Sequence, residues 1–262
     1  MYRFYVDENK HTGNQFIVTG EDVNHIKNVL RLKPHDNIVL CNTCGTDYIC
    51  EIEGFTDNKE CVCNILKKEN SLTELSVKII LYQGIPKKDK FELIVQKCTE
   101  LGVSEIVPVK MKRSIAKIED EKAELKKALR WSEIARAAAM QSGRGIIPKI
   151  GKAVTLKEAV TRAKEDSGFI AVPYENANGM KSLKEFVDNV KAEVLKDQEN
   201  VPVVSVFIGP EGGFDESEIE FLKESNGTTV SLGKRILRTE TAGFVISSII
   251  MYELECMNDS IS

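Results

Sequence analysis

The sequence predicts two domains, a small N-terminal β-barrel and a C-terminal α/β domain built on a mostly parallel sheet. Short runs of alternating apolar and polar residues fill the first 66 positions. From residue 76 onward, apolar strands alternate with amphipathic helices, which is typical of a parallel sheet covered on both faces. The polar stretch 67–74 separates the two patterns. We therefore expect domains at residues 1–72 and 73–262.

The N-terminal part contains four predicted strands and one helix. Apolar alternation and β-branched residues mark the strands, and a small barrel is the natural way for such short strands to close. The helix pattern stops before Pro34. The expected strands are Gln15–Val18, Asn37–Cys41, Asp47–Ile52 and Glu60–Leu66, and the expected helix is Glu21–Leu30.

The C-terminal part repeats a strand–helix unit. Gly102 has the position of a helix C-cap, and Pro202 precedes a buried strand. The expected strands are Val77–Leu81, Ile106–Val109, Phe169–Val172, Val203–Ile208 and Thr228–Leu232. The expected helices are Phe91–Leu101, Glu119–Met140, Leu183–Leu195, Glu216–Glu224 and Thr239–Glu255.

Composition excludes several classes of protein. Hydrophobic residues make up 42% and charged residues 29%, which is typical of a globular protein and not of a disordered one. No apolar run approaches the length of about 20 residues that spans a membrane, and no apolar signal core follows Met1. We expect a cytoplasmic protein without a membrane partner. The odd number of cysteines, 7, favours reduced thiols over a disulfide framework.

A zinc site is the alternative interpretation of four of these cysteines. Cys41 and Cys44 are separated by two residues, but only one residue separates Cys61 from Cys63. This second spacing departs from that of usual zinc motifs. Buried thiols in the barrel core are the simpler interpretation, and no metal is predicted.

Charge is distributed unevenly along the chain. The net charge is −4, yet residues 76–150 carry 16 Lys and Arg against 9 Asp and Glu. A basic region inside an acidic protein suggests a polyanion-binding face, and lysines that merely solvate exposed helices are the alternative.

A glycine-rich turn follows the predicted strand Val203–Ile208. The sequence Gly-Pro-Glu-Gly-Gly, residues 209–213, matches neither a Walker A loop nor a dinucleotide fingerprint. Ligands of open parallel sheets collect at the carboxyl ends of strands, and glycines let the backbone approach a ligand there. A tight strand-to-helix turn without a ligand is the alternative.

A second motif places two arginines, Arg235 and Arg238, directly before the last apolar helix. Cations at a helix N-terminus oppose the helix dipole by some tenths of a kcal/mol, so this position favours an anionic partner. The alternative is an internal ion pair with Glu211, Glu240 or another carboxylate.

Together these motifs resemble those of the RsmE family of 16S ribosomal RNA (uracil-N3)-methyltransferases, which belong to the SPOUT superfamily. The resemblance rests on Gly209–Gly213 followed by Leu232–Ala242, and three further segments agree with it. These segments are Gln83–Gly102, Arg130–Pro148 and His25–Arg31, the last resembling part of the family's PUA-like barrel.

The resemblance implies a trefoil-knotted methyltransferase domain, S-adenosylmethionine as the cofactor and a homodimer. The knot is an exception to the rule that chains avoid threading. Backbone groups of three loops would bind the cofactor. The implied cofactor-binding residues are Val172, Pro173, Ile208, Gly209, Pro210, Glu211, Gly212, Gly213, Leu232, Gly233, Ile236, Leu237, Arg238 and Thr239.

The implied reaction is methylation of N3 of uridine 1498, in standard numbering, in 16S ribosomal RNA or the assembled small subunit. Candidate catalytic residues are Arg238 and Arg235, which would stabilise an anionic uracil, and Glu211 and Glu240 as acids without a decided role. Candidate RNA-binding residues are Arg3, Lys27, Arg31, Lys33, Lys87, Lys88, Arg113, Arg136 and Arg144. Ribose 2′-O-methylation by another SPOUT enzyme and a non-catalytic RNA-binding assembly factor are the alternatives.

Overall fold

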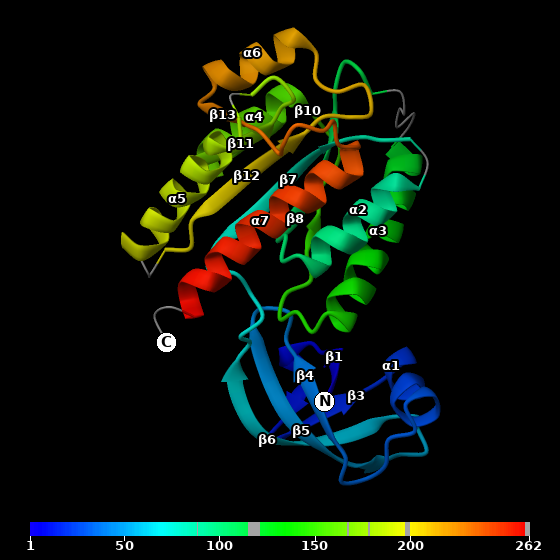
Figure 1. Cartoon of the computed structure of the whole chain (residues 1–262). Coiled ribbons are helices and arrows are strands. Elements are labelled where there is room, and N and C mark those ends of the chain that lie inside the picture. The colour runs from blue at the N-terminus through cyan, green and yellow to red at the C-terminus, as the bar shows by residue number, and fades with distance from the viewer. Residues whose placement is uncertain (88, 115–120, 167, 178, 197–199, 260–262) are drawn as a thin grey trace. The chain divides into compact units, whose positions relative to one another are not determined.

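The computed structural model divides into two compact units (Figure 1). It describes all residues except 88, 115–120, 167, 178, 197–199 and 260–262. The N-terminal unit comprises Met1–Glu74 and Ala139–Ile147, and the C-terminal unit comprises Leu75–Ala138 and Pro148–Ser262. The division after residue 74 lies close to the expected boundary. The inclusion of residues 139–147 in the N-terminal unit was not predicted.

The N-terminal unit is a six-stranded sheet with strand order β1-β4-β5-β6-β3-β2. The β1–β4 pair is parallel and the others are antiparallel. Its strands are β1 (Tyr2–Tyr5), β2 (His11–Thr12), β3 (Gln15–Val18), β4 (Asn37–Cys41), β5 (Thr46–Phe55) and β6 (Cys61–Asn70). Its helical segments are a 3-10 turn (Glu8–Lys10), α1 (Glu21–Asn24) and a π-helical segment (His25–Val29).

Strand β6 extends four residues beyond the predicted strand, into the polar stretch expected to be a linker. Lys67 to Asn70 continue to pair with β5, so that Asn70 lies opposite Thr46. Ladder hydrogen bonds use the backbone and therefore do not require apolar side chains. Three cysteines, Cys50, Cys61 and Cys63, are fully buried in the core of this unit together with Phe4, Phe16 and Leu40.

The C-terminal unit contains a seven-stranded sheet with the order β10-β8-β7-β12-β11-β13, and β9 also pairs with β8. Every pairing recorded among the described residues of this sheet is parallel. The strands are β7 (Lys78–Gly84), β8 (Glu105–Lys110), β9 (Lys149–Ile150), β10 (Val154–Thr155), β11 (Phe169–Pro173), β12 (Val203–Ile208) and β13 (Gly227–Val230).

Helices cover both faces of this sheet (Figure 1). Helix α7 packs on α2 and over β7 and β12, whereas α4 packs on β8. On the α4 side, Tyr82 and Val107 belong to one apolar core with Leu156 and Ala159. The helices are α2 (Lys90–Glu100), α3 (Glu121–Gln141), α4 (Leu156–Asp166), α5 (Lys181–Lys196), α6 (Glu216–Glu224) and α7 (Thr239–Asp259). Helix α4 was not predicted, and the expected start of the long helix at 119–120 lies outside the described residues.

The chain returns to the centre of the sheet after its last strand. Strand β13 lies at the edge beside β11, yet α7 packs over β7 and β12. The segment 231–238 makes this return across the carboxyl ends of the strands. Such a return is necessary for the predicted knot. The knot itself stays a prediction. Among the described residues, no helix has the length and hydropathy needed to cross a membrane.

Candidate active site

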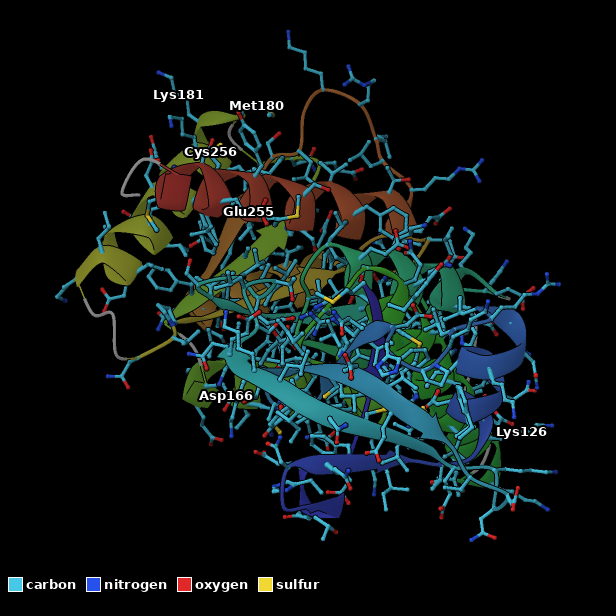
Figure 2. All side chains as sticks on the ribbon, turned by 90° about the horizontal axis from the view of Figure 1, so that it is seen from below. Lys126, Asp166, Met180, Lys181, Glu255 and Cys256 are labelled. Atoms are coloured by element: carbon cyan, nitrogen blue, oxygen red, sulfur yellow. The ribbon has the colours of Figure 1, made fainter. Side chains whose placement is uncertain are left out.

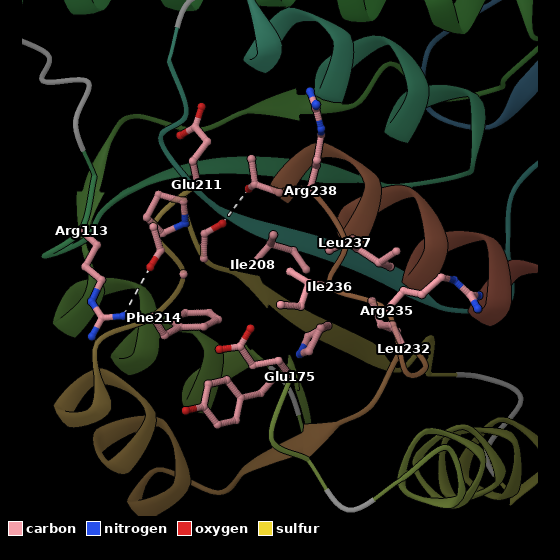
Figure 3. A pocket seen from close by; sticks show the side chains of 18 of the residues that line it. Arg113, Glu175, Ile208, Glu211, Phe214, Leu232, Arg235, Ile236, Leu237 and Arg238 are labelled. Atoms are coloured by element: carbon pink, nitrogen blue, oxygen red, sulfur yellow. Dashed lines mark hydrogen bonds between the residues drawn. The ribbon is translucent and has the colours of Figure 1, made fainter.

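A cavity of about 410 Å³ lies within the C-terminal unit, at the carboxyl ends of β11 and β12 (Figure 3). Its size is within the range of small-molecule sites, and its position is the one expected for a ligand of an open parallel sheet. Three segments supply most of its wall. They contribute Pro173, Tyr174 and Glu175; Ile208, Gly209, Pro210, Glu211, Gly212, Gly213 and Phe214; and Leu232, Gly233, Arg235, Ile236, Leu237, Arg238, Thr239 and Ala242. Lys90 and Arg113 complete the lining.

The structure brings together all the expected cofactor-binding residues except Val172. Val172 is fully buried in the apolar core. It lies within strand β11, where alternate side chains point to opposite faces of the sheet, and the cavity is lined by the residues that follow it. Sequence reasoning did not place Lys90, Tyr174, Glu175, Phe214 and Ala242 at the cavity. Tyr174, Glu175, Phe214 and Ala242 lie within three residues of a segment that was identified, so extending each loop would have found them. Lys90 comes from α2, far away in the sequence, and no loop motif indicated it.

Glycine is required in the turn after β12. Gly213 has a φ of +68°, a conformation that disfavours other residues, and nothing lies within 4 Å of where its Cβ would be. The Gly213 N–H donates to the Pro210 carbonyl at 2.9 Å, which closes the turn. Asp215 then begins α6 with a capping box that it forms with Glu218. The glycine-rich motif is therefore a tight turn whose residues line the cavity.

Thr239 connects two strand ends beneath the cavity. Its hydroxyl donates to the Gly209 carbonyl at 2.6 Å and accepts from Nε2 of Gln83 at 2.8 Å. Gln83 is at the end of β7 and is fully buried. Sequence reasoning named Gln83 only as part of the family resemblance and gave it no role. The contact ties the start of α7 to the ends of β7 and β12.

Replacing Thr239 by valine is expected to destabilise the protein by about 1–3 kcal/mol. The change keeps the shape of the side chain but leaves a buried amide N–H and a buried carbonyl without this partner. Urea denaturation measures the loss, and Thr239→Ser, which keeps the hydroxyl, serves as the control. A Thr239→Val variant as stable as the unmodified protein would contradict this role.

Arg235 and Arg238 are both exposed at the cavity. Neither guanidinium group has an ion pair or hydrogen bond among the described residues, and Glu211 and Glu240 pair with Lys90, so the alternative of an internal pair with Glu211 or Glu240 is wrong. Figure 3 shows the two guanidinium groups extending in different directions, and Ile236 between them in sequence is 84% exposed. Two free guanidinium groups at one cavity are suited to an anionic ligand.

The two candidate acids contact Lys90 instead. Lys90 Nζ lies 3.2 Å from Glu211 Oε1 and 3.4 Å from Glu240 Oε2. Burial by itself raises the pKa of Glu211. The hydrogen bond from the Lys87 backbone N–H and the Lys90 ammonium lower the pKa by more than burial raises it, so the pKa lies below its ordinary value. A carboxylate with a lowered pKa is a poor general base at neutral pH. Glu240 is buried and does not line the cavity.

Two of the expected RNA-binding arginines are held inside the N-terminal unit, and their assignment is corrected here. Arg3 donates to both carboxylate oxygens of Asp47, at 2.5 and 2.7 Å. Arg144 is 2% exposed, and its guanidinium donates to Glu74. A buried guanidinium that is paired with a carboxylate is not presented to a phosphate.

The remaining expected RNA-binding residues are distributed over both units. Lys27, Arg31 and Lys33 are exposed in the N-terminal unit, and Lys27 lies over the Phe55 ring. In the C-terminal unit, Lys87 is exposed and Arg136 is half-buried. Arg113 lines the cavity and donates to the Gly212 carbonyl at 3.4 Å. Lys88 lies outside the described residues.

Comparison with known proteins agrees with this two-part architecture. A family model for the RNA methyltransferase PUA domain matches residues 18–66, and one for the RNA methyltransferase domain matches residues 73–251. Ribosomal RNA small subunit methyltransferase E of Bacillus subtilis is 34% identical over 260 residues, which is 98% of each chain. The chain belongs to this family. The resemblance inferred from its motifs is therefore confirmed.

Other members of the family match over similar lengths. The enzyme of the same name from Mesomycoplasma hyopneumoniae is 33% identical over 250 residues, covering 94% of this chain and 97% of the relative. A crystal structure of the Neisseria gonorrhoeae enzyme of the same name, bound to S-adenosylmethionine, has 28% sequence identity to this chain. It covers 97% of this chain and 98% of that chain, with a TM-score of 0.79. This chain is accordingly an S-adenosylmethionine-dependent ribosomal RNA methyltransferase.

The residues around the cavity fit this cofactor. Ile208, Leu232 and Leu237 offer apolar surface suited to a purine ring, and Gly209, Gly212 and Gly213 line the cavity with backbone alone, without an intervening side chain. The Glu211 carboxylate provides negative charge near a cationic ligand. We therefore assign cofactor binding to this cavity as a proposal.

Proposed function

We propose that this enzyme methylates N3 of uridine 1498 in 16S ribosomal RNA. The observation that carries the proposal is the pair of unpartnered arginines, Arg235 and Arg238, at the proposed cofactor cavity of a chain from this family. When bound, S-adenosylmethionine supplies the methyl group from its sulfonium centre. The chain itself must bind the base, orient it and stabilise it after N3 has lost its proton.

The arginines suit the stabilising role. Uracil without its N3 proton is an anion whose charge spreads onto the two carbonyl oxygens on either side. A guanidinium that donates to such an oxygen favours the anion, because charge-assisted hydrogen bonds are about twice as strong as neutral ones. We assign this contact to Arg238, and we assign contact with a phosphate or with the same base to Arg235.

Neither of the two candidate acids, Glu211 and Glu240, is suited to remove the N3 proton. Glu211 has a lowered pKa and Glu240 contacts Lys90. We therefore propose that the arginines favour loss of this proton to solvent and that neither glutamate accepts it.

Methyl transfer to unmodified small ribosomal subunits, followed by nucleoside mass spectrometry, tests the reaction. The expected product is 3-methyluridine. A 2′-O-methylated nucleoside would instead support the ribose-methylating alternative. Transfer to protein-free 16S RNA in a parallel reaction distinguishes the assembled subunit from free RNA as the substrate.

We further propose that the N-terminal unit contacts RNA phosphates through Lys27, Arg31 and Lys33. The double change Arg31→Glu and Lys33→Glu is expected to weaken RNA binding about tenfold or more at low salt, and by less at high salt, because phosphate contacts depend strongly on salt. Filter binding at two salt concentrations measures this. Lys59→Glu, a charge reversal elsewhere in the same unit, is the control. Unchanged affinity of the double variant would exclude this surface.

We also propose that the protein acts in the cytoplasm as a homodimer. A mostly apolar groove of about 350 Å³ between α5 and α7 supports a second copy as its occupant. Its apolar lining residues are Met180, labelled in Figure 2, with Leu183, Val187, Ile249 and Tyr252. Sedimentation velocity of the full chain measures the oligomeric state, and a monomer at micromolar concentration would contradict the proposal.

A further inference from the structure

Lys90 joins three segments that are far apart in the sequence. It is the first residue of α2, and its ammonium group lies 3.2 Å from Glu211 and 3.4 Å from Glu240. Glu211 belongs to the turn after β12, and Glu240 is the second residue of α7. The Lys90 side chain is 31% exposed and lines the cavity, so the contact forms part of the cavity wall.

The cluster formed by Lys90, Glu211 and Glu240 contains two carboxylates and one ammonium group. Glu211 also accepts from the Lys87 backbone N–H at 2.9 Å. The buried Oε2 atom of Glu240 has no hydrogen bond among the described residues, and the Lys90 ammonium is its ion-pair partner. Without the ammonium group, two partly buried like charges would face each other across the cavity wall. Lys90 therefore holds the two carboxylates together and leaves the cluster with one net negative charge.

This charge acts differently on the two forms of the cofactor. S-adenosylmethionine has a positive sulfonium centre, whereas S-adenosylhomocysteine, the product, has an uncharged thioether sulfur in its place. The two molecules otherwise present the same groups. A more negative cluster at the cavity would therefore favour binding of S-adenosylmethionine over S-adenosylhomocysteine. A less negative cluster would reduce that preference.

We propose that Lys90 is a positioning residue that holds Glu211 and Glu240 and, by cancelling part of their charge, limits the preference of the cavity for the cationic cofactor over its uncharged product. The consequence is a balance between binding the cofactor and releasing the product. This inference rests on the cofactor and its proposed cavity, not on which atom of the RNA is methylated.

Isothermal titration calorimetry of the full chain with each molecule tests the proposal without RNA or turnover. In Lys90→Gln, the affinity for S-adenosylmethionine relative to that for S-adenosylhomocysteine should rise by about threefold or more. Lys90→Arg keeps the charge and should keep the ratio. The double variant Lys90→Gln with Glu211→Gln restores one net negative charge and should bring the ratio back. Lys97→Gln, on the same helix but paired with Glu100, is the matched control.

Glu211→Gln with Lys90 intact provides the opposite test, should Lys90→Gln fail to fold. It lowers the negative charge of the cluster, so the ratio should shift toward S-adenosylhomocysteine. Equal weakening of both molecules in these variants would overturn the proposal, because it would show a purely structural contact. An unchanged ratio in both Lys90→Gln and Glu211→Gln would overturn it as well. Since RNA is absent, these outcomes are independent of the methylation site.

Discussion

Replacing Arg238 by alanine is expected to lower the rate of methyl transfer about 100- to 1,000-fold. The guanidinium is exposed at the cavity and has no partner among the described residues, so its loss removes a donor from the proposed uracil anion without breaking an internal contact. Loss of one donor to a developing negative charge costs an enzyme about this much. Single-turnover transfer of labelled methyl groups to small ribosomal subunits measures the rate.

Affinity for S-adenosylmethionine separates this effect from damage to the cavity. The backbone of residue 238 remains in place, so the dissociation constant is expected to change by less than about threefold. Arg130→Ala, which removes an exposed arginine paired with Glu92, is the matched control for loss of a positive charge. Transfer at the unmodified rate in Arg238→Ala would disprove the assignment and direct attention to Arg235.

The second large effect is expected on stability, from Glu74→Ala. The Glu74 carboxylate accepts from Arg144 Nη2 at 2.5 Å and from the backbone N–H groups of Gly145 and Ile146 at 2.9 and 3.3 Å. The Arg144 side chain is 3% exposed. Removing one member of a buried ion pair costs about 3–5 kcal/mol, because the other charge stays buried. We expect Glu74→Ala to lower the free energy of unfolding of the N-terminal unit by this amount.

Hydrogen exchange of the amides in 139–147 and in β6, followed by mass spectrometry, measures this loss within the unit itself. A two-unit chain need not unfold in one transition, so a local probe is preferable to a single midpoint. Glu69→Ala is the matched control, since its ion pair with Lys67 is exposed and such pairs contribute about 0–1 kcal/mol. Equal protection of Glu74→Ala and Glu69→Ala would contradict the expected role of Glu74.

Periodicity and turn chemistry predicted the local structure well. Strands β3, β4 and β12 and helix α6 have the predicted bounds. Helix α4 and the strands β1, β2, β9 and β10 were missed. Charged residues interrupt the apolar pattern of α4, and the four strands are only two to four residues long, which is too short for a clear alternation. The predicted helix 21–30 divides into α1 and a π-helical segment, since its apolar spacing only approximates a regular helical stripe.

Sequence alone determined the family and most of the residues of the cavity, because the two loop motifs are contiguous and each follows a strand. Only the tertiary structure decided which charges are free. Arg3 and Arg144 have the same chemistry as Arg235 and Arg238, yet the first two are paired inside the N-terminal unit while the last two are exposed at the cavity. Ion pairs form between residues distant in the chain, as Arg144 and Glu74 are, and their geometry exists only after folding.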